Sequence, residues 1–224
     1  YDTENFDEIQ VPSVWQMAGY DTHQYTNIRY PFPFDPPYVP QDIPCGAYVH
    51  TFEYSRDEKA PKSFLNFEGV DSCFYVWLNG FYVGYSQVSH MTSEFDITDL
   101  LQDGANTIAV LVMKWCDGSY LEDQDKFRMS GIFRDVYILK RPNQAISDYH
   151  IKTRIEDMLA KVELDVKFYS PVNVKISIED ENGAVVAVGS IAGEGTAVVE
   201  IANPELWNTE NPYLYKLILE TENE

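Results

Sequence analysis

Charged side chains are concentrated between Ser119 and Val136, where four acids and two arginines lie between two stretches that predict β-strands. Composition alone favours a solvated surface loop for such a segment. The alternative is a site at which charges are held in fixed positions. Closely spaced acids such as Glu122, Asp123 and Asp125 could imitate a catalytic acid/base pair. Because neighbouring loop residues point in different directions, we assign no catalytic role to these three acids.

The elements that must hold this segment are predicted to be β-strands, because alternating and β-branched or aromatic residues recur at short intervals. No stretch sustains a helical apolar period for more than about two turns. Asn79-Gly80 separates two aromatic runs, Cys73–Leu78 and Phe81–Tyr85, and supplies the positive φ angles of a tight hairpin turn. Further strands are expected at Thr107–Trp115 and Asp135–Lys140.

The pattern changes around Arg141–Ala145, after which aromatic density falls and Val and Ile predominate. We therefore expect two domains, residues 1–142 and 143–224. The second suits an immunoglobulin-like β-sandwich. Its expected strands are Val162–Tyr169, Val172–Ile178 and Ala184–Val188, with a hairpin turn at Asn182-Gly183.

Composition excludes several classes of partner. The 224 residues hold 16 Lys and Arg against 36 Asp and Glu, a formal net charge of −20 that would repel nucleic acid and anionic membranes. The longest apolar run, Ile108–Met113, is far too short to span a bilayer, and no signal-like segment opens the sequence, which favours a cytoplasmic protein. Three widely spaced cysteines, Cys45, Cys73 and Cys116, suggest free buried thiols.

Seven segments in the first part of the chain carry a resemblance to known enzymes: Val11–Tyr20, Tyr25–Pro31, Pro36–Pro40, Gly69–Ser72, Trp77–Tyr85, Ser93–Asp96 and Phe133–Val136. In order and spacing they resemble the amino-terminal region of lac-type retaining β-galactosidases, members of glycoside hydrolase family 2. The likeness resumes at Pro204–Trp207.

This resemblance implies an all-β chain in which a jelly-roll sandwich of the galactose-binding type precedes an immunoglobulin-like sandwich, both truncated. The parent enzyme would hydrolyse terminal β-galactosides of the lactose type with retention. Its two catalytic glutamates would lie in a (β/α)-barrel that this chain lacks, so the chain alone is expected to be inactive. The alternative is a free-standing carbohydrate-binding module.

The resemblance also implies roles for particular residues. Asp125 matches the family acid that helps bind a sodium ion and lies beside the galactose hydroxyls, a suitable duty for a carboxylate. Asn27 matches an asparagine whose amide can donate to and accept from a sugar hydroxyl, and Tyr25 would lie beside it. From its sequence position alone, Asn27 would be a turn residue before a strand.

Gln87 and Asp117 match two oxygen ligands of a structural magnesium site, whose other ligands come from a segment that this chain lacks. We therefore expect sodium and magnesium in the complete enzyme and no stably bound ion in this part. Arg128 and Arg134 are expected to hold the acidic loop by pairing with Glu122, Asp123 or Asp135, without a specific assignment.

The implied partners are galactosides and the barrel and remaining domains of the parent chain. The resemblance also implies a homo-oligomer for the full-length protein. A long loop that completes a neighbouring subunit's site in the best-studied branch corresponds here to the short stretch Ser190–Thr196, so we do not expect that contact.

Overall fold

A computed structural model describes residues 2–122, 124–193 and 195–222 and divides the chain into two compact units, residues 1–140 and 141–224. The division lies close to the one expected after Pro142. Within the described ranges, no helix is both long and apolar enough to cross a membrane. Regular structure is almost entirely β-strand, as the sequence predicts.

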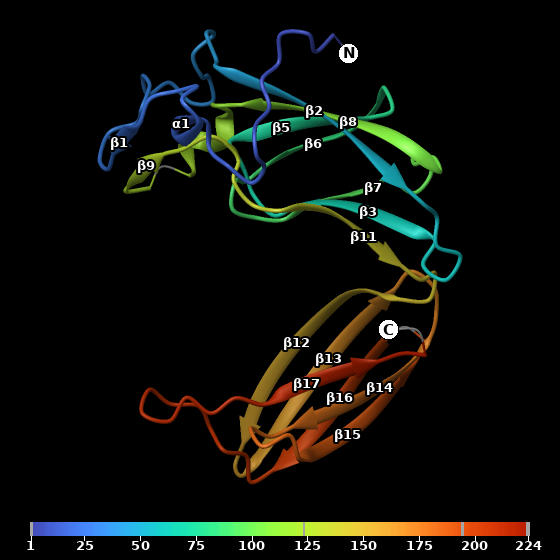
Figure 1. The fold of residues 1–224 in the computed structure, drawn as a ribbon. Helices are drawn as coiled ribbons and strands as arrows, with labels where there is room; N and C mark the ends of the chain where they lie inside the picture. Colours follow the sequence, from blue (N-terminus) through green and yellow to red (C-terminus); the bar gives the residue numbers. More distant parts are fainter. Residues whose placement is uncertain (1, 123, 194, 223–224) are drawn as a thin grey trace. The chain divides into compact units, whose positions relative to one another are not determined.

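The first unit contains two larger sheets that share a core, together with two two-stranded sheets, β1-β9 and β10-β4 (Figure 1). One larger sheet has the strand order β2-β8-β5-β6 and the other has the order β11-β3-β7. The elements are α1 (Trp15–Ala18), β1 (Gln24–Thr26), β2 (Cys45–Tyr54), β3 (Lys62–Phe67), β4 (Val70–Asp71), β5 (Cys73–Leu78), β6 (Phe81–Gln87), β7 (Ser93–Asp96), β8 (Gly104–Met113), the 3-10 helix η1 (Asp117–Tyr120), β9 (Lys126–Arg128), β10 (Gly131–Ile132) and β11 (Val136–Arg141).

The alternation of β5 explains how this core forms. Its residues Phe74, Val76 and Leu78 are buried, whereas Tyr75 and Trp77 face the other side of the sheet and are half-buried. Phe67 of β3 packs against Phe74 with ring centroids 4.7 Å apart, which joins the two sheets. Burial of such aromatic side chains supplies much of the free energy that holds a sandwich together.

The predicted hairpin between β5 and β6 is confirmed. Asn79 and Gly80 have φ angles of 52° and 85°, as a tight two-residue turn requires. The Asn79 amide nitrogen donates to the Leu100 carbonyl and to Asn106 Oδ1, at 3.0 and 2.8 Å. The turn is therefore fixed from inside the unit as well as by its own backbone.

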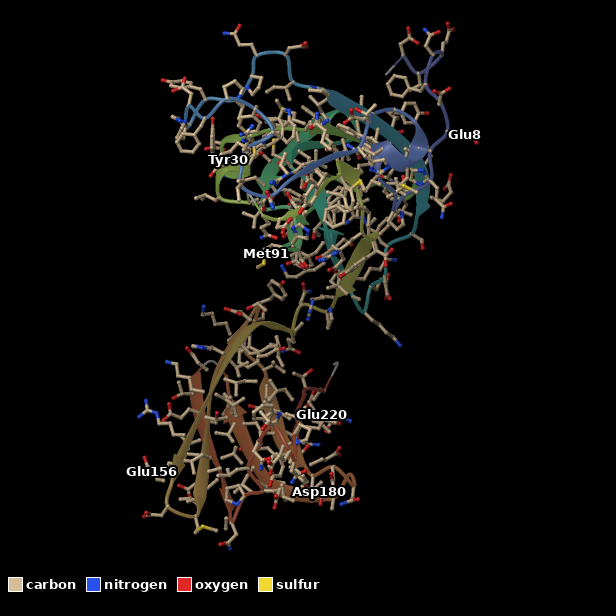
Figure 2. All side chains as sticks on the ribbon, turned by 90° about the vertical axis from the view of Figure 1, so that its left-hand side faces the viewer. Glu8, Tyr30, Met91, Glu156, Asp180 and Glu220 are labelled. Carbon is tan, nitrogen blue, oxygen red and sulfur yellow. The ribbon has the colours of Figure 1, made fainter. Side chains whose placement is uncertain are left out.

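The second unit is a sandwich of two three-stranded antiparallel sheets, β12-β13-β16 and β15-β14-β17. Side chains fill the space between the sheets (Figure 2), and Leu164, Ile176 and Ile178 are among the most deeply buried. The strands are β12 (Ile146–Glu156), β13 (Leu159–Phe168), β14 (Asn173–Glu179), β15 (Val185–Ala192), β16 (Gly195–Ala202) and β17 (Lys216–Glu220).

The β14–β15 hairpin forms as predicted, and Asn182 and Gly183 lie in its turn, which is longer than two residues. Of these two residues, Gly183 alone has a positive φ, 79°. The Gly183 N–H donates to the Asp180 carbonyl and the Asp180 N–H donates to the Ala184 carbonyl, so the loop is longer and a register shift follows at Glu179. The Asp180 carboxylate accepts from the N–H groups of Asn182 and Ala184, and these bonds stabilise the longer turn.

The architecture is thus a jelly-roll sandwich followed by an immunoglobulin-like sandwich, in agreement with the predicted fold class. Cys73 and Cys116 are free buried thiols as expected. Cys45 is a free thiol but exposed, because it begins β2, an edge strand of its sheet.

Candidate functional site

Two short strands bring distant parts of the chain together in the first unit. Strand β1 pairs antiparallel with β9, in the register Gln24↔Arg128, Tyr25↔Phe127 and Thr26↔Lys126. Asn27 directly follows β1 and Asp125 directly precedes β9, so these two residues lie at the same end of the pair. We call β1, β9 and the residues Asn27 and Asp125 the β1–β9 ribbon.

The side chains of Tyr25, Asn27 and Asp125 converge at this ribbon. The Tyr25 hydroxyl donates to Asp125 Oδ1 at 2.5 Å. This hydrogen bond is the main reason why the pKa of Tyr25 is raised, and burial and the negative charge of Asp125 act in the same direction. A hydrogen bond with the Asn27 side chain acts in the opposite direction. The structure therefore joins Tyr25 to Asp125 by a hydrogen bond and places Asn27 at the same end of the ribbon.

Tyr25, Asn27 and Asp125 are all exposed and can therefore contact a ligand from solvent. Tyr25 is 56% exposed, and both Asn27 and Asp125 are exposed. Asn27 Oδ1 accepts from the Ile28 N–H at 2.6 Å, which directs the amide NH₂ group elsewhere. A carboxylate, an amide and a phenol at one surface position can bind the hydroxyl groups of a polar ligand, and carboxylate oxygens are also suitable for a hard cation.

An exposed aromatic residue that sequence reasoning missed lies beside these polar groups. Phe127 is 61% exposed, and its ring centroid lies 5.6 Å from that of Tyr25 and 6.3 Å from that of His23. The available signal was an apolar residue between Lys126 and Arg128 in an otherwise charged segment. Phe127 gives the ribbon an apolar surface next to its polar one.

Arg128 contacts the acidic loop through main-chain oxygens. Its Nη2 donates to the Gln124 carbonyl at 2.9 Å and its Nη1 to the Glu122 carbonyl at 3.4 Å. The Glu122 carboxylate accepts from the N–H and the hydroxyl of Ser89, both at 2.7 Å. Of the proposed partners, Asp123 lies outside the described residues.

Arg134, unlike Arg128, contacts the backbone around Glu68 and His90. Its Nη1 donates to the carbonyls of His90 and Glu68, at 3.3 and 3.5 Å. The positive charge of Arg134 is also one cause of the lowered pKa of Glu68, after hydrogen bonds from Tyr137 and Thr92, which burial opposes. Arg134 therefore supports the strand connections around Glu68.

A small polar cavity of about 20 Å³ lies next to the ribbon. It has room for roughly one water molecule. Its charged lining comes from Asp71, Glu122, Lys126 and Arg128. Two acidic and two basic side chains thus line the cavity, and Lys126 and Arg128 among them belong to β9.

The predicted magnesium ligands Gln87 and Asp117 form a second cluster. A Cβ at Gly118 would lie 3.5 Å from the Gln87 side chain, which shows how closely the Asp117-Gly118 segment approaches Gln87. Gln87 Oε1 accepts from the Tyr85 hydroxyl at 2.8 Å, and Asp117 Oδ1 accepts from the Gly118 N–H at 2.9 Å. Both residues offer the oxygen donors that magnesium prefers, but two protein oxygens fill only part of an octahedral shell.

Larger groups of metal-binding side chains are absent from the described part of the chain. Among residues 2–122, 124–193 and 195–222, no group of three or more His, Cys, Asp or Glu residues could hold a metal ion.

Comparison with known proteins identifies the family. Residues 1–142 match the sugar binding domain of glycosyl hydrolases family 2, and residues 144–224 match the adjoining domain described as glycosyl hydrolases family 2. The chain belongs to glycosyl hydrolase family 2. The family resemblance predicted from the sequence is confirmed, and the residues that meet at the β1–β9 ribbon lie in the sugar binding domain of this family.

Curated relatives of this family 2 chain are β-galactosidases. The chain is 49% identical to the β-galactosidase of Staphylococcus xylosus over 217 residues, which cover 96% of this chain and 22% of the relative. It is 48% identical to that of Actinobacillus pleuropneumoniae over 220 residues, 97% of this chain and 21% of the relative. The chain therefore spans about a fifth of the length of these relatives and matches part of a larger enzyme.

Solved structures of other proteins share the fold. A β-glucuronidase from an uncultured Clostridium species superimposes with a TM-score of 0.68 at 24% identity, over 87% of this chain and 36% of the other. At this identity the likeness establishes only the fold and does not establish the substrate. Substrate preference has to be argued from the site and from the closer sequence relatives.

Proposed function

We propose that this chain is the amino-terminal, non-catalytic part of a β-galactosidase that hydrolyses terminal β-galactosides with retention. In this proposal the β1–β9 ribbon contributes galactose-positioning residues to an active site in a (β/α)-barrel outside the chain. The observation that carries the proposal is the convergence of Asn27, Tyr25 and Asp125 at one exposed position. The 48–49% identity to β-galactosidases supports galactose as the sugar.

The chemistry of the three side chains suits a sugar. Galactose presents adjacent hydroxyl groups, each of which donates one hydrogen bond and accepts others. Asp125 can only accept when ionised, Asn27 can do both, and Tyr25 completes the group as a donor to Asp125. Such contacts fix the orientation of the substrate and contribute to rate without taking part in bond cleavage.

Sodium and magnesium are further parts of this proposal. Asp125 would supply a carboxylate oxygen to sodium beside the sugar, and Gln87 and Asp117 would supply two oxygens to a structural magnesium. Ligands from the rest of the parent protein would complete both sites. We expect neither ion to bind stably to this chain alone.

The proposed experiment uses the full-length parent enzyme and two variants, Asp125→Asn and Asn27→Ala. We expect kcat/KM for an aryl β-galactoside to fall by about 100-fold in each, because loss of a positioning contact misplaces the reacting atoms. Asp148→Asn, on an exposed strand of the second unit, is the matched control and should behave as wild type. Wild-type turnover by both ribbon variants would contradict the proposal, and turnover of an aryl β-glucuronide in place of the galactoside would contradict the assigned sugar.

A second candidate is a free-standing carbohydrate-binding module, and one feature favours it. An open hollow of about 450 Å³ lies on the first unit, within the size range of small-molecule sites. Its lining includes the hydroxyls of Thr51 and Thr107 and the side chain of Gln102. Asn79 also lines it, but its amide is already bonded within the unit.

A sugar titration of this chain alone separates the two candidates. Galactose and lactose would be added in the presence of sodium while amide shifts are followed by NMR. We expect no saturable shift, since the ribbon forms only part of the site. Saturable shifts at Thr51 and Thr107 would favour the binding module, and saturable shifts at Asn27 and Asp125 would mean that the ribbon holds sugar unaided.

A further inference from the structure

Arg128 connects the two segments that carry the proposed galactose-positioning residues. Its Nε donates to Thr26 Oγ1 at 2.8 Å, and Thr26 lies between Tyr25 and Asn27. Its Nη2 donates to the carbonyl of Gln124, the residue before Asp125, at 2.9 Å. One guanidinium group therefore contacts the immediate neighbour of Asn27 and the immediate neighbour of Asp125.

The burial of Arg128 makes these contacts strong. The residue is 7% exposed, so its bonds to Thr26 and Gln124 are partly shielded from water. Hydrogen bonds to a charged group are stronger than those between neutral groups, and a buried charge that loses a partner is costly. Arg128 is thus held in one place by the same bonds through which it holds the two segments.

The planar shape of the side chain matters as much as its charge. An arginine presents its N–H groups in a fixed fork, whereas a lysine ammonium is a compact point charge on a flexible stem. The fork lets Nε and Nη2 donate hydrogen bonds to acceptors on two different segments at the same time. A lysine at position 128 could bind one of them but could not set the distance between them.

The acidic loop is also anchored at Glu122, by Ser89 as well as by Arg128. The Glu122 carboxylate accepts two hydrogen bonds from Ser89, and the Glu122 carbonyl accepts from Arg128 Nη1 at 3.4 Å. The short connection to Asp125 is therefore bonded on the Glu122 side and at Gln124. This arrangement leaves the Asp125 carboxylate exposed while fixing the backbone that carries it.

We propose that Arg128 is a positioning residue that sets the relative placement of Asn27 and Asp125 through its hydrogen bonds to Thr26 and Gln124. The proposal rests on the galactose-positioning function argued above. Arg128 itself contacts neither substrate nor reacting atoms in this proposal. It acts through the backbone of the two segments on which the sugar contacts are carried.

The sharpest test removes one hydrogen bond and then restores it. In the full-length enzyme, Thr26→Val deletes the acceptor of Arg128 Nε at nearly constant volume, and Thr26→Ser keeps it. We expect Thr26→Val to lower kcat/KM for an aryl β-galactoside about tenfold, with a rise in KM, and Thr26→Ser to retain wild-type values within about twofold. Arg128→Lys should lower kcat/KM about 100-fold. Thr153→Val, on an exposed strand of the second unit, is the matched control.

Measuring kcat and KM per active site, alongside the melting temperature, separates positioning from simple folding. If Arg128 were only structural, the folded fraction of each variant would keep the wild-type KM while the melting temperature fell. Equal impairment of Thr26→Val and Thr26→Ser, or wild-type KM in both Thr26→Val and Arg128→Lys, would overturn the proposal. Wild-type activity of Asp125→Asn and Asn27→Ala would instead overturn the proposed function, so the two failures are distinguishable.

Discussion

Asp71 Oδ2 lies 3.7 Å from Lys126 Nζ, and both side chains line the small cavity next to the β1–β9 ribbon. Burial raises the pKa of Asp71 to about 6, and the nearby Glu122 carboxylate acts in the same direction. The charges of Lys126 and Arg128 and a hydrogen bond from Ser89 oppose this rise but do not cancel it. The folded protein therefore holds a proton on Asp71 more tightly than the unfolded chain does.

The first prediction concerns the pH dependence of stability and the variant Asp71→Asn. Because the pKa in the folded state exceeds the ordinary value of 3.8, the contribution of Asp71 is fully present below pH 3.8 and is lost as the pH rises through about 6. A shift of this size corresponds to no more than about 3 kcal/mol. We expect Asp71→Asn to remove this loss. The free energy of unfolding of the variant relative to that of the wild type should therefore increase from pH 4 to pH 7.

Urea unfolding of this chain at pH 4, 5, 6 and 7, followed by tryptophan fluorescence, measures this dependence. Asp148→Asn is a suitable control, since its side chain is 63% exposed. A difference between Asp71→Asn and wild type that stays constant from pH 4 to pH 7 would contradict the prediction. Such a constant difference would show that the Lys126 charge fully offsets the effect of burial on the pKa of Asp71.

The second prediction concerns Lys114, which pairs with Asp21 and is buried. Burial would raise the pKa of Asp21, but hydrogen bonds from Lys114, the Thr22 N–H and Gln16, together with the Lys114 charge, outweigh it and lower the pKa below 3.8. Lys114→Met would leave Asp21 without its ion partner. We expect a loss of about 1.5–3 kcal/mol at pH 7, the range for hydrogen bonds to a charged group, because Asp21 is only partly buried and keeps its bonds from Gln16 and the Thr22 N–H.

Pairing Lys114→Met with Asp21→Asn should recover part of this loss, because no uncompensated charge then remains. The wild-type contribution of Asp21 is present above pH 3.8 and is lost as the pH falls through its lowered folded pKa, so the effect of Lys114→Met should diminish in acid. Urea midpoints at pH 7 and pH 3 would show this. Additive effects of the two substitutions would count against a coupled pair.

The third prediction concerns Val88, which has a φ of 77°. A β-branched residue in this region is strained, at a cost of order 1–3 kcal/mol, whereas glycine adopts the conformation freely. Glycine also increases the entropy of the unfolded chain, which cancels roughly 0.5–1 kcal/mol of the stability gained from relieving the strain. We expect Val88→Gly to stabilise the chain by about 1 kcal/mol, measured as an increase in the urea midpoint, and a decrease would show that the strain is absent.

The strands could be predicted from the sequence where alternation was strong and turn residues were clear. Asn79-Gly80 indicated the β5–β6 hairpin, and the runs near Thr107 and Val162 correspond to β8 and β13. The β1–β9 pair could not be predicted in this way, since both strands are three residues long and their partners lie about a hundred positions apart. Such pairing depends on tertiary contacts that no local pattern records.

The candidate site was predicted from resemblance more than from physical pattern. Asn27 on its own reads as a turn residue, and nothing local connects it with Asp125. The resemblance named Tyr25, Asn27 and Asp125, and the structure brings them together. Sequence reasoning expected Arg128 to pair with acids of the loop, and among those acids Asp123 lies outside the described residues. The contacts of Arg128 to Thr26 and Gln124 were not predicted, because they become visible only when β1 and β9 are paired.

The last prediction concerns the Tyr25 hydroxyl in the full-length enzyme. Tyr25→Phe removes the donor to Asp125 Oδ1 while preserving the ring that lies beside Phe127. If the hydroxyl holds Asp125 in place for galactose, the variant should lower kcat/KM for an aryl β-galactoside by about tenfold, which corresponds to the loss of roughly one hydrogen bond. Because the Tyr25 side chain is largely exposed, the melting temperature should change little. Tyr149→Phe, at an exposed tyrosine of the second unit, controls for the chemical change. Wild-type kinetics in Tyr25→Phe would mean that Asp125 is held by its backbone anchors alone, and Arg128 would then be the principal determinant of its position.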